Sequence, residues 1–532
     1  MKKTKRCIIA LAALAICAAA AGCNSKKDTA TTSELNFTGY PISTDKTLTY
    51  WGVMDSTLAT VAQNFGDTPL GKKLAEKTGI NVQYMHPPVG SEAEQLSILL
   101  STDDLPDIIE NDWYHYAGGP QKVLNEKILM SLNDVIDKYA PNLKKYLSEH
   151  EDINKMVVTD DKTYYVFPFI AGDDLLCVSQ GIMVRQDWLD ELGLDMPQTM
   201  DEWHEVLTAF KEKKGAQAPL VVIGEYPTTF YEGGFVGAYG VKQDFLVDDG
   251  KIIYGPADPR YKEFLQTFAQ WYKEGLIEEN LPNVDPKNIN VNMLNGKSGV
   301  TFGYAGSVMG QINKSLKEKD PKAKVVPAPY PSTVKGEKAE IGQRSPLYTG
   351  PGSAGITTSC KNIELAARFL DFGYSEEGNM LYNFGIEGES YNMVDGYPTY
   401  TDVIKNNKDG LTVSQAMAKY IRASSCAPFV QRKEYIEQYY SEPEQKEALT
   451  VWGDTNAKEH LMPAITFTSE ESEEISRIMT NIQTYMEEKT TTMILGKEDI
   501  SAFDNYVKTM NDYGLEKVLE IYNAAYQRSL KR

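Results

Sequence analysis

Residues 80–112 read INVQYMHPPVGSEAEQLSILLSTDDLPDIIEND, and this stretch decides the fold class of the chain. The apolar alternation at residues 80–84 predicts a strand, and the apolar residues at 96–100 recur at helical spacing. Ser91 and Glu94 stand three residues apart just before that run, a capping-box spacing that predicts the start of the helix. The letters LPDIIEND are typical of a buried strand that ends in polar residues. The stretch therefore predicts a strand, a helix and a second strand in succession.

The same alternation extends beyond this stretch in both directions. Residues 47–53 are typical of a short strand, and residues 68–79 run from Thr-Pro to Gly with the start and stop signals of a helix. Strands and helices that alternate in this way predict a parallel sheet with right-handed crossovers. Further along, the apolar run at 218–226 predicts a strand, and the Asp-Gly pair at 249–250 predicts a hairpin turn.

The first 23 residues read MKKTKRCIIALAALAICAAAAGC and predict export. A basic start followed by the apolar run at 8–20 is typical of a secretory signal, because the run is too short to span a bilayer. The letters AAGC resemble a bacterial lipobox, in which the thiol of Cys23 would carry a diacylglyceryl group. We therefore expect a lipoprotein signal peptide at 1–22 and a flexible tether at 23–45 after the lipidated cysteine. The alternative is an uncleaved signal anchor.

Length and charge limit the function classes. About 510 residues remain after the signal, enough for two or more domain-sized units. The formal charge is −20, and removal of the signal with its four positive charges leaves about −24. A protein this acidic is a poor binder of nucleic acid or of anionic lipid headgroups. The 32 tyrosines provide flat rings with polar tips, some of which could form a surface that stacks on sugars.

Metal, cofactor and catalytic signatures are absent from the sequence. Cys177, Cys360 and Cys426 remain after processing and form no CxxC pair, so a thiolate metal site is not expected. The five histidines are scattered without HExxH, and no GxSxG elbow occurs. GPGSAG at 350–355 formally matches GxGxxG, but a β-branched run follows it instead of a helix. We expect no metal, no cofactor and no catalysis.

Four stretches, at 105–119, 160–211, 350–391 and 494–528, carry a resemblance to a known family. They begin LPDIIENDWYHYAGG, DDKTYYVFPF, GPGSAGITTSC and ILGKEDISAF. In their order and spacing the chain resembles the extracellular solute-binding lipoproteins of carbohydrate ABC importers. It is most similar to the large branch that includes alginate-binding and related oligosaccharide-binding proteins.

The resemblance implies an α/β fold of the type II periplasmic-binding-protein kind, with two lobes and a ligand cleft between them. Each lobe would hold a mainly parallel sheet flanked by helices. We expect lobe one at 46–170 and 348–392, and lobe two at 171–347 and 393–532. The implied protein is a monomer that is lipid-anchored on the extracellular face of the cell membrane. It would bind an oligosaccharide and deliver it to two ABC permease subunits, without binding nucleic acid.

Ligands of open α/β sheets sit beyond the carboxyl ends of the strands, and sugar recognition combines aromatic faces with polar groups. Candidate ligand-binding residues chosen on this basis follow predicted strand ends, crossings or turns. They are Trp51, Asn111, Trp113, Tyr114, Asp173, Tyr226, Phe230, Tyr304 and Glu387. For some of these residues a purely structural role is the alternative. DWYHY could form a surface turn, Asp173 could lie in a solvated hinge turn, and Glu387 could belong to the turn that follows a helix.

Three other functions remain open at this stage. A secreted glycoside hydrolase or polysaccharide lyase would use paired carboxylates, but with 74 acidic residues such pairs are expected by chance. A binding protein for a non-sugar solute, such as a peptide, would share the fold. A structural or adhesive lipoprotein would show no saturable binding of a small ligand.

Overall fold

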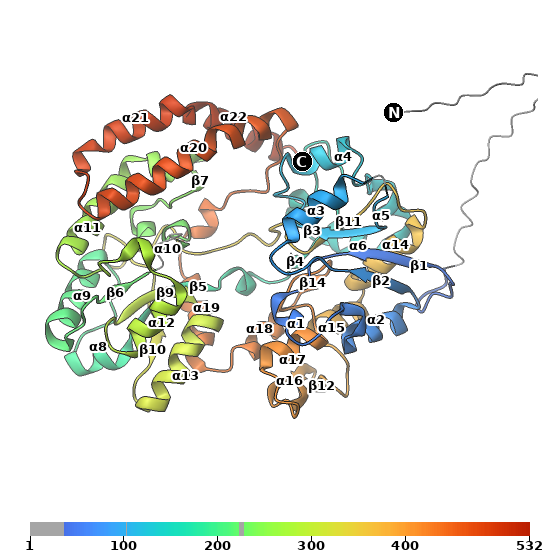
Figure 1. The fold of residues 1–532 in the computed structure, drawn as a ribbon, viewed down its shortest axis with the longest axis horizontal. Coiled ribbons are helices and arrows are strands. Elements are labelled where there is room, and N and C mark those ends of the chain that lie inside the picture. Colours follow the sequence, from blue (N-terminus) through green and yellow to red (C-terminus); the bar gives the residue numbers. More distant parts are fainter. Residues whose placement is uncertain (1–36, 103, 223–227) are drawn as a thin grey trace, which may run out of the picture. The chain divides into compact units, whose positions relative to one another are not determined.

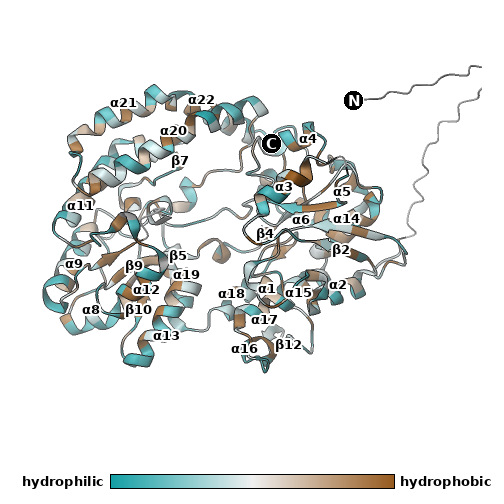
Figure 2. Ribbon diagram, in the orientation of Figure 1, coloured by the Kyte–Doolittle hydropathy of each residue, from teal (hydrophilic) through white to brown (hydrophobic). Residues whose placement is uncertain are grey.

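The computed structural model describes residues 37–102, 104–222 and 228–532, and these form two lobes that each contain a four-stranded sheet (Figure 1). The expected signal, most of the expected tether with Cys23, and Tyr226 lie outside the described residues. Figure 2 shows hydrophobic residues concentrated on the strands of both sheets and hydrophilic residues along the outer helices. The sheets therefore organise the apolar cores of the molecule.

The first sheet has the strand order β11-β3-β1-β2. Strands β1 (Thr47–Trp51), β2 (Asn81–Met85) and β3 (Ile108–Asn111) run parallel, as the alternating sequence predicts. Strand β11 (Ser353–Ile356) closes the β3 edge and runs antiparallel to it. The helices that connect and cover this sheet include α2 (Pro69–Thr78), α3 (Glu92–Leu100), α4 (Gly119–Asn125), α5 (Asn133–Tyr139), α6 (Pro141–Glu149), α7 (Glu151–Met156), α14 (Ile363–Asp371) and α15 (Glu376–Phe384).

Local signals set the limits of α2 but not those of α3. The Thr68 hydroxyl caps α2 by accepting from the Gly71 amide at 3.0 Å, and Gly79 ends the helix with a left-handed φ of 71°. The capping box expected at Ser91 is wrong, because the Ser91 side chain makes no capping hydrogen bond. Glu92 accepts from the Gly90 amide at 2.8 Å instead.

The second sheet has the strand order β10-β5-β9-β6. Strands β6 (Leu220–Val221), β9 (Val300–Tyr304) and β10 (Val325–Pro327) point one way, and β5 (Gln180–Arg185) runs against them. The Asp-Gly hairpin is confirmed: β7 (Phe245–Asp248) and β8 (Lys251–Tyr254) flank Asp249 and Gly250, which both have positive φ. The helices of this lobe include α8 (Gln186–Leu192), α9 (Met200–Lys214), α10 (Thr228–Tyr231), α11 (Pro259–Lys273), α12 (Pro286–Leu294), α13 (Gly310–Lys319), α19 (Pro443–Gly453), α20 (Ser469–Ile494), α21 (Phe503–Tyr513) and α22 (Leu515–Ser529).

The segment from 393 to about 431 packs with the first lobe, which corrects the expected boundary at 392. Helix α17 (Val413–Tyr420) packs on α2 and on α1 (Ser56–Ala59), both of the first lobe. Strand β14 (Val430–Gln431) pairs with β4 (Ile170–Ala171), at the end of the first lobe's early part. The other elements of this part of the chain are β12 (Tyr391–Val394), β13 (Tyr397–Tyr400) and α16 (Asp402–Lys405). Helix α18 (Lys433–Tyr439) follows and packs in part against the second-lobe core.

Candidate functional site

Two pockets are lined by residues of both lobes and of the segments that cross between them. The first, here called the Tyr114 pocket, has a volume of about 460 Å³. The second, the Tyr304 pocket, has a volume of about 640 Å³. Both volumes fall within the usual range of small-ligand sites.

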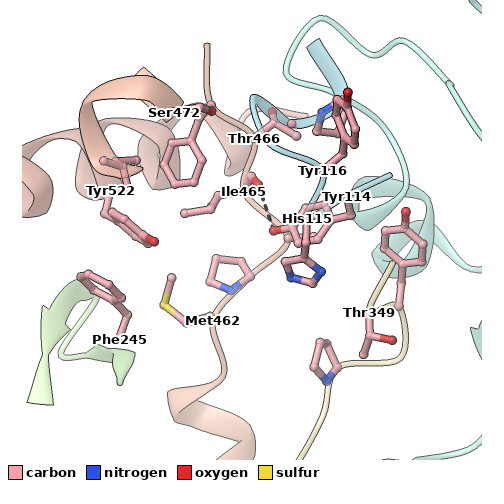
Figure 3. Close-up of a pocket in the computed structure, with 18 of the residues that line it drawn as sticks. Tyr114, His115, Tyr116, Phe245, Thr349, Met462, Ile465, Thr466, Ser472 and Tyr522 are labelled. Atoms are coloured by element: carbon pink, nitrogen blue, oxygen red, sulfur yellow. Dashed lines mark hydrogen bonds between the residues drawn. The ribbon is translucent and has the colours of Figure 1, made fainter. Parts of the chain in front are cut away.

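The Tyr114 pocket has aromatic walls that come from distant parts of the chain. Figure 3 shows Tyr114 and His115, which follow β3, on one side and Phe245 and Tyr522 of the second lobe on the other. Phe245 and Tyr522 stack with ring centroids 4.1 Å apart. The Tyr114 hydroxyl donates to the Ile465 carbonyl at 2.9 Å, and burial raises the pKa of Tyr114 well above its usual value. The pocket thus offers flat apolar faces already held in place.

The floor of the Tyr114 pocket at 461–467 is held by an arginine at the end of the chain. Arg532 donates to the Ala464 carbonyl at 2.6 Å and to the Thr466 hydroxyl at 2.8 Å. The same guanidinium donates to the Asp160 carboxylate of the first lobe at 2.6 Å. The side chain of Arg532 is 1% exposed, so these charge-assisted bonds are shielded from water and fix the floor between the lobes.

The Tyr304 pocket lies at the carboxyl ends of strands from both sheets. Asp55 follows β1 of the first lobe, while Tyr304 ends β9 of the second lobe and is 49% exposed. Rings and hydroxyls dominate the remaining wall. The aromatic residues are Phe169, Tyr435, Tyr439 and Tyr440, and the hydroxyl residues are Thr57, Ser179, Ser307, Ser414 and Ser424. The position agrees with the rule that α/β sheets bind ligands beyond their carboxyl ends.

A buried ion pair supports the wall of the Tyr304 pocket from behind. The Glu110 carboxylate accepts from the Arg422 guanidinium at 2.6 Å and from the Tyr50 hydroxyl at 2.5 Å. Arg422 also donates to the carbonyl of Cys426, whose φ of 62° lies in the left-handed region. Because Cys426 lines the pocket, this network fixes the shape of the 422–426 segment against the first sheet.

Three predicted aromatic site residues are core residues in the structure. Trp113 is 0% exposed, and its indole N–H donates to the Ile109 carbonyl at 3.1 Å, so no ring face is available to a ligand. Trp51 is buried in the same cluster. Phe230 is buried among the rings of the second-lobe core. These placements correct the expected roles of all three residues.

The other predicted residues are spread over different surfaces. Tyr114 and Tyr304 line the two interlobe pockets, and Asn111 ends β3 opposite Ser353. Asp173 caps a short helix by accepting from the Leu175 amide and lines a separate hollow. Glu387 lines another hollow beside α15. The structure therefore does not bring the nine candidates together, and Tyr226 lies outside the described residues.

Sequence reasoning missed the tyrosines of the segment YIEQYY at 435–440. Tyr435 and Tyr439 stack with ring centroids 5.9 Å apart, and both line the Tyr304 pocket beside Tyr440. Three tyrosines within six residues are a local sequence signal from which an aromatic site could have been predicted. Within the described ranges, no cluster of three or more His, Cys, Asp or Glu residues could hold a metal ion, and no helix is long and apolar enough to cross a membrane.

Comparison with known proteins identifies the family. Residues 56–380 match the family model described as bacterial extracellular solute-binding protein. The chain is 24% identical to FusA, a fructooligosaccharide ABC transporter substrate-binding protein of Streptococcus pneumoniae, over 99% of this chain and 98% of FusA. It is 25% identical to the lipoprotein LipO of Bacillus subtilis, over 87% of this chain and 89% of LipO.

A solved structure agrees with the expected fold. The alginate-binding protein AlgQ2, 24% identical, superposes with a TM-score of 0.71 over 92% of this chain and 100% of AlgQ2. This likeness confirms the two-lobed α/β fold. Since the family model spans more than half of the chain, the protein belongs to the bacterial extracellular solute-binding proteins.

Proposed function

We propose that this protein captures an oligosaccharide between its lobes and delivers it, intact, to the permease subunits of an ABC importer. The observation that carries the proposal is the pair of interlobe pockets, whose walls combine aromatic rings with hydroxyl groups. The relative FusA, which is named as a fructooligosaccharide-binding protein, supports the same assignment.

The chemistry of the Tyr304 pocket suits sugars. An aromatic face packs on the C–H face of a pyranose or furanose ring, and serine hydroxyls both donate to and accept from sugar hydroxyls. Asp55 and Tyr304 come from different lobes, so one ligand can contact both. A ligand that makes more contacts with closed lobes than with open lobes shifts the population toward the closed form.

The proposal includes a lipid anchor at Cys23 on the extracellular face of the membrane. It is supported by the AAGC letters after a basic and then apolar segment, and by the relative LipO, which is named as a lipoprotein. Two acyl chains anchor a protein stably where a single chain does not. We further propose that the protein works as a monomer with two permease subunits.

The test is a thermal-shift screen of the mature protein against oligosaccharides, followed by titration calorimetry on the hits. Ligand at about 100 times its Kd adds about 2.7 kcal/mol of stability. For a chain of this size that corresponds to a rise in Tm of about 2–3 °C. Chromatography after incubation should recover the oligosaccharide unchanged, whereas steady release of shorter sugars would favour a hydrolase or lyase.

A matched pair of tyrosine variants locates the binding site. Tyr304→Ala should weaken oligosaccharide binding at least tenfold, because the exposed ring lines the pocket and its removal costs stacking area. Tyr513→Ala removes a ring of similar exposure, 43%, from helix α21 and should leave affinity within twofold. Equal affinity of the two variants would place the ligand elsewhere.

A further inference from the structure

The ligands named for related proteins include both uncharged and acidic glycans. FusA is named for fructooligosaccharides, which are uncharged, and AlgQ2 for alginate, whose residues each carry a carboxylate. Resting on the proposed function, we propose that this protein selects uncharged oligosaccharides and rejects uronate-containing ones. The proposal stands on the charged groups that line the two interlobe pockets.

The Tyr304 pocket has a negative wall. Among its described lining residues the single charged side chain is Asp55, and none is a lysine, arginine or histidine. The Asp55 carboxylate accepts from the Thr57 amide at 2.9 Å and the Leu58 amide at 3.1 Å, which orients it at the start of α1. A carboxylate accepts hydrogen bonds from sugar hydroxyls but repels the carboxylate of a uronic acid.

Arg422, the cation that supports the wall of that pocket, is already paired. Arg422 lies behind the wall, and its guanidinium contacts the buried Glu110 carboxylate at 2.6 Å. Recognition of a carboxylate in a desolvated site commonly relies on a bidentate arginine or on a lysine. Arg422 cannot serve a ligand without leaving Glu110 as an uncompensated buried charge.

The cations of the Tyr114 pocket are also matched by carboxylates. Each of its three basic lining residues lies within 4 Å of an aspartate of this chain. The pairs are His115 with Asp112 at 2.8 Å, Lys242 with Asp244 at 3.8 Å, and Arg344 with Asp174 at 3.0 Å. Of these aspartates only Asp244 lines the pocket, and Asp174 also contacts Lys458 at 2.9 Å. The lining cations of the Tyr114 pocket are thus each in contact with a carboxylate, the wall of the Tyr304 pocket is negative, and the net charge of the mature chain disfavours polyanions at long range.

The first test is calorimetric titration of the mature protein with two panels of tetrasaccharides at low and high salt. The uncharged panel contains fructo-, gluco-, galacto- and manno-oligosaccharides, and the acidic panel contains galacturonate and alginate oligomers. At least one uncharged sugar should bind, with affinity changing less than twofold between 20 and 200 mM NaCl, because no ion pair forms. Every acidic sugar should bind at least 100-fold more weakly.

The outcomes separate the two proposals. An acidic sugar that binds more tightly than all uncharged ones, with affinity that falls at high salt, would overturn the charge selectivity and leave the oligosaccharide-binding function standing. If no sugar of either panel binds, the proposed function itself fails, and the selectivity fails with it.

A gain-of-charge variant tests the role of the pocket directly. Ser307→Lys places a cation at an exposed position in the Tyr304 pocket, and Ser148→Lys places one at an exposed position on α6, outside both pockets. We expect Ser307→Lys to raise affinity for an acidic oligosaccharide at least tenfold over Ser148→Lys at low salt. Equal affinities in the two variants would overturn the proposal that pocket charge sets the selectivity.

Discussion

Replacement of Trp113 by alanine should destabilise the first lobe without removing a ligand contact. The side chain is 0% exposed and packs with Trp51, Ile109 and Val123 in the core. Truncation of a buried aromatic residue to alanine costs about 3–5 kcal/mol. The variant also leaves the Ile109 carbonyl without the indole donor now 3.1 Å away, a loss of about 1 kcal/mol that falls within the same range.

The expected fall in Tm follows from the size of the protein. Unfolding entropy of about 2.1 cal/mol/K per residue gives about 1 kcal/mol/K for roughly 500 residues, so the Tm should fall by about 3–5 °C. Trp113→Phe keeps a buried ring but lacks the N–H donor, and it should lose about 1–2 °C. Differential scanning calorimetry without ligand measures both shifts, and titration calorimetry at 15 °C measures sugar affinity, expected within threefold of wild type. Unchanged Tm with a thirty-fold loss of affinity in Trp113→Ala would refute the burial argument.

Three further predictions concern charge and anchoring. Glu110→Ala should lower the free energy of unfolding in urea by about 3–5 kcal/mol, because it leaves the buried guanidinium of Arg422 uncompensated. Adding Arg422→Met should recover most of that loss. Additive losses in the double variant would contradict coupling of the pair. Burial raises the pKa of Asp371 to about 6 from 3.8, although Asn142 donates to it. A raised carboxyl pKa gives stability that is present below about pH 4 and is lost as pH rises through 6. The free energy of unfolding of wild type, relative to that of Asp371→Asn, should therefore fall by up to about 3 kcal/mol over that window. A difference between the two proteins that does not change with pH would contradict this prediction. Cys23→Ala should release the protein from the membrane fraction, and equal partitioning of variant and wild type would argue against the lipid anchor.

Local structure was predictable where a few neighbouring residues determine it. Helix α2 begins at Thr68 and Pro69 and ends at Gly79. The capping hydrogen bond and the backbone angles that these residues favour do not depend on the rest of the fold. The Asp249-Gly250 turn is similar, because only residues that tolerate positive φ fit it. The parallel first sheet followed from the alternation of such local elements.

The site was less predictable because distant segments decide which side chains stay exposed. Trp113 follows a strand end, as a ligand residue would, but Leu96, Val123 and Tyr165 join it in one core cluster. The return of residues 393–431 to the first lobe involves contacts such as Arg422 with Glu110, residues 312 positions apart. No spacing rule in a single sequence encodes such a pairing.

Strand β11 completes the sheet of the first lobe late in synthesis. Its residues, Ser353–Ile356, emerge from the ribosome about 240 residues after Asn111 of β3, the strand whose edge they cover. Until then the nascent chain carries an open edge that could pair with another chain and aggregate. The strand β3 is only four residues long and contains the charged Glu110, two properties that limit such pairing. The edge of β3 is therefore covered only after most of the second lobe has been synthesised.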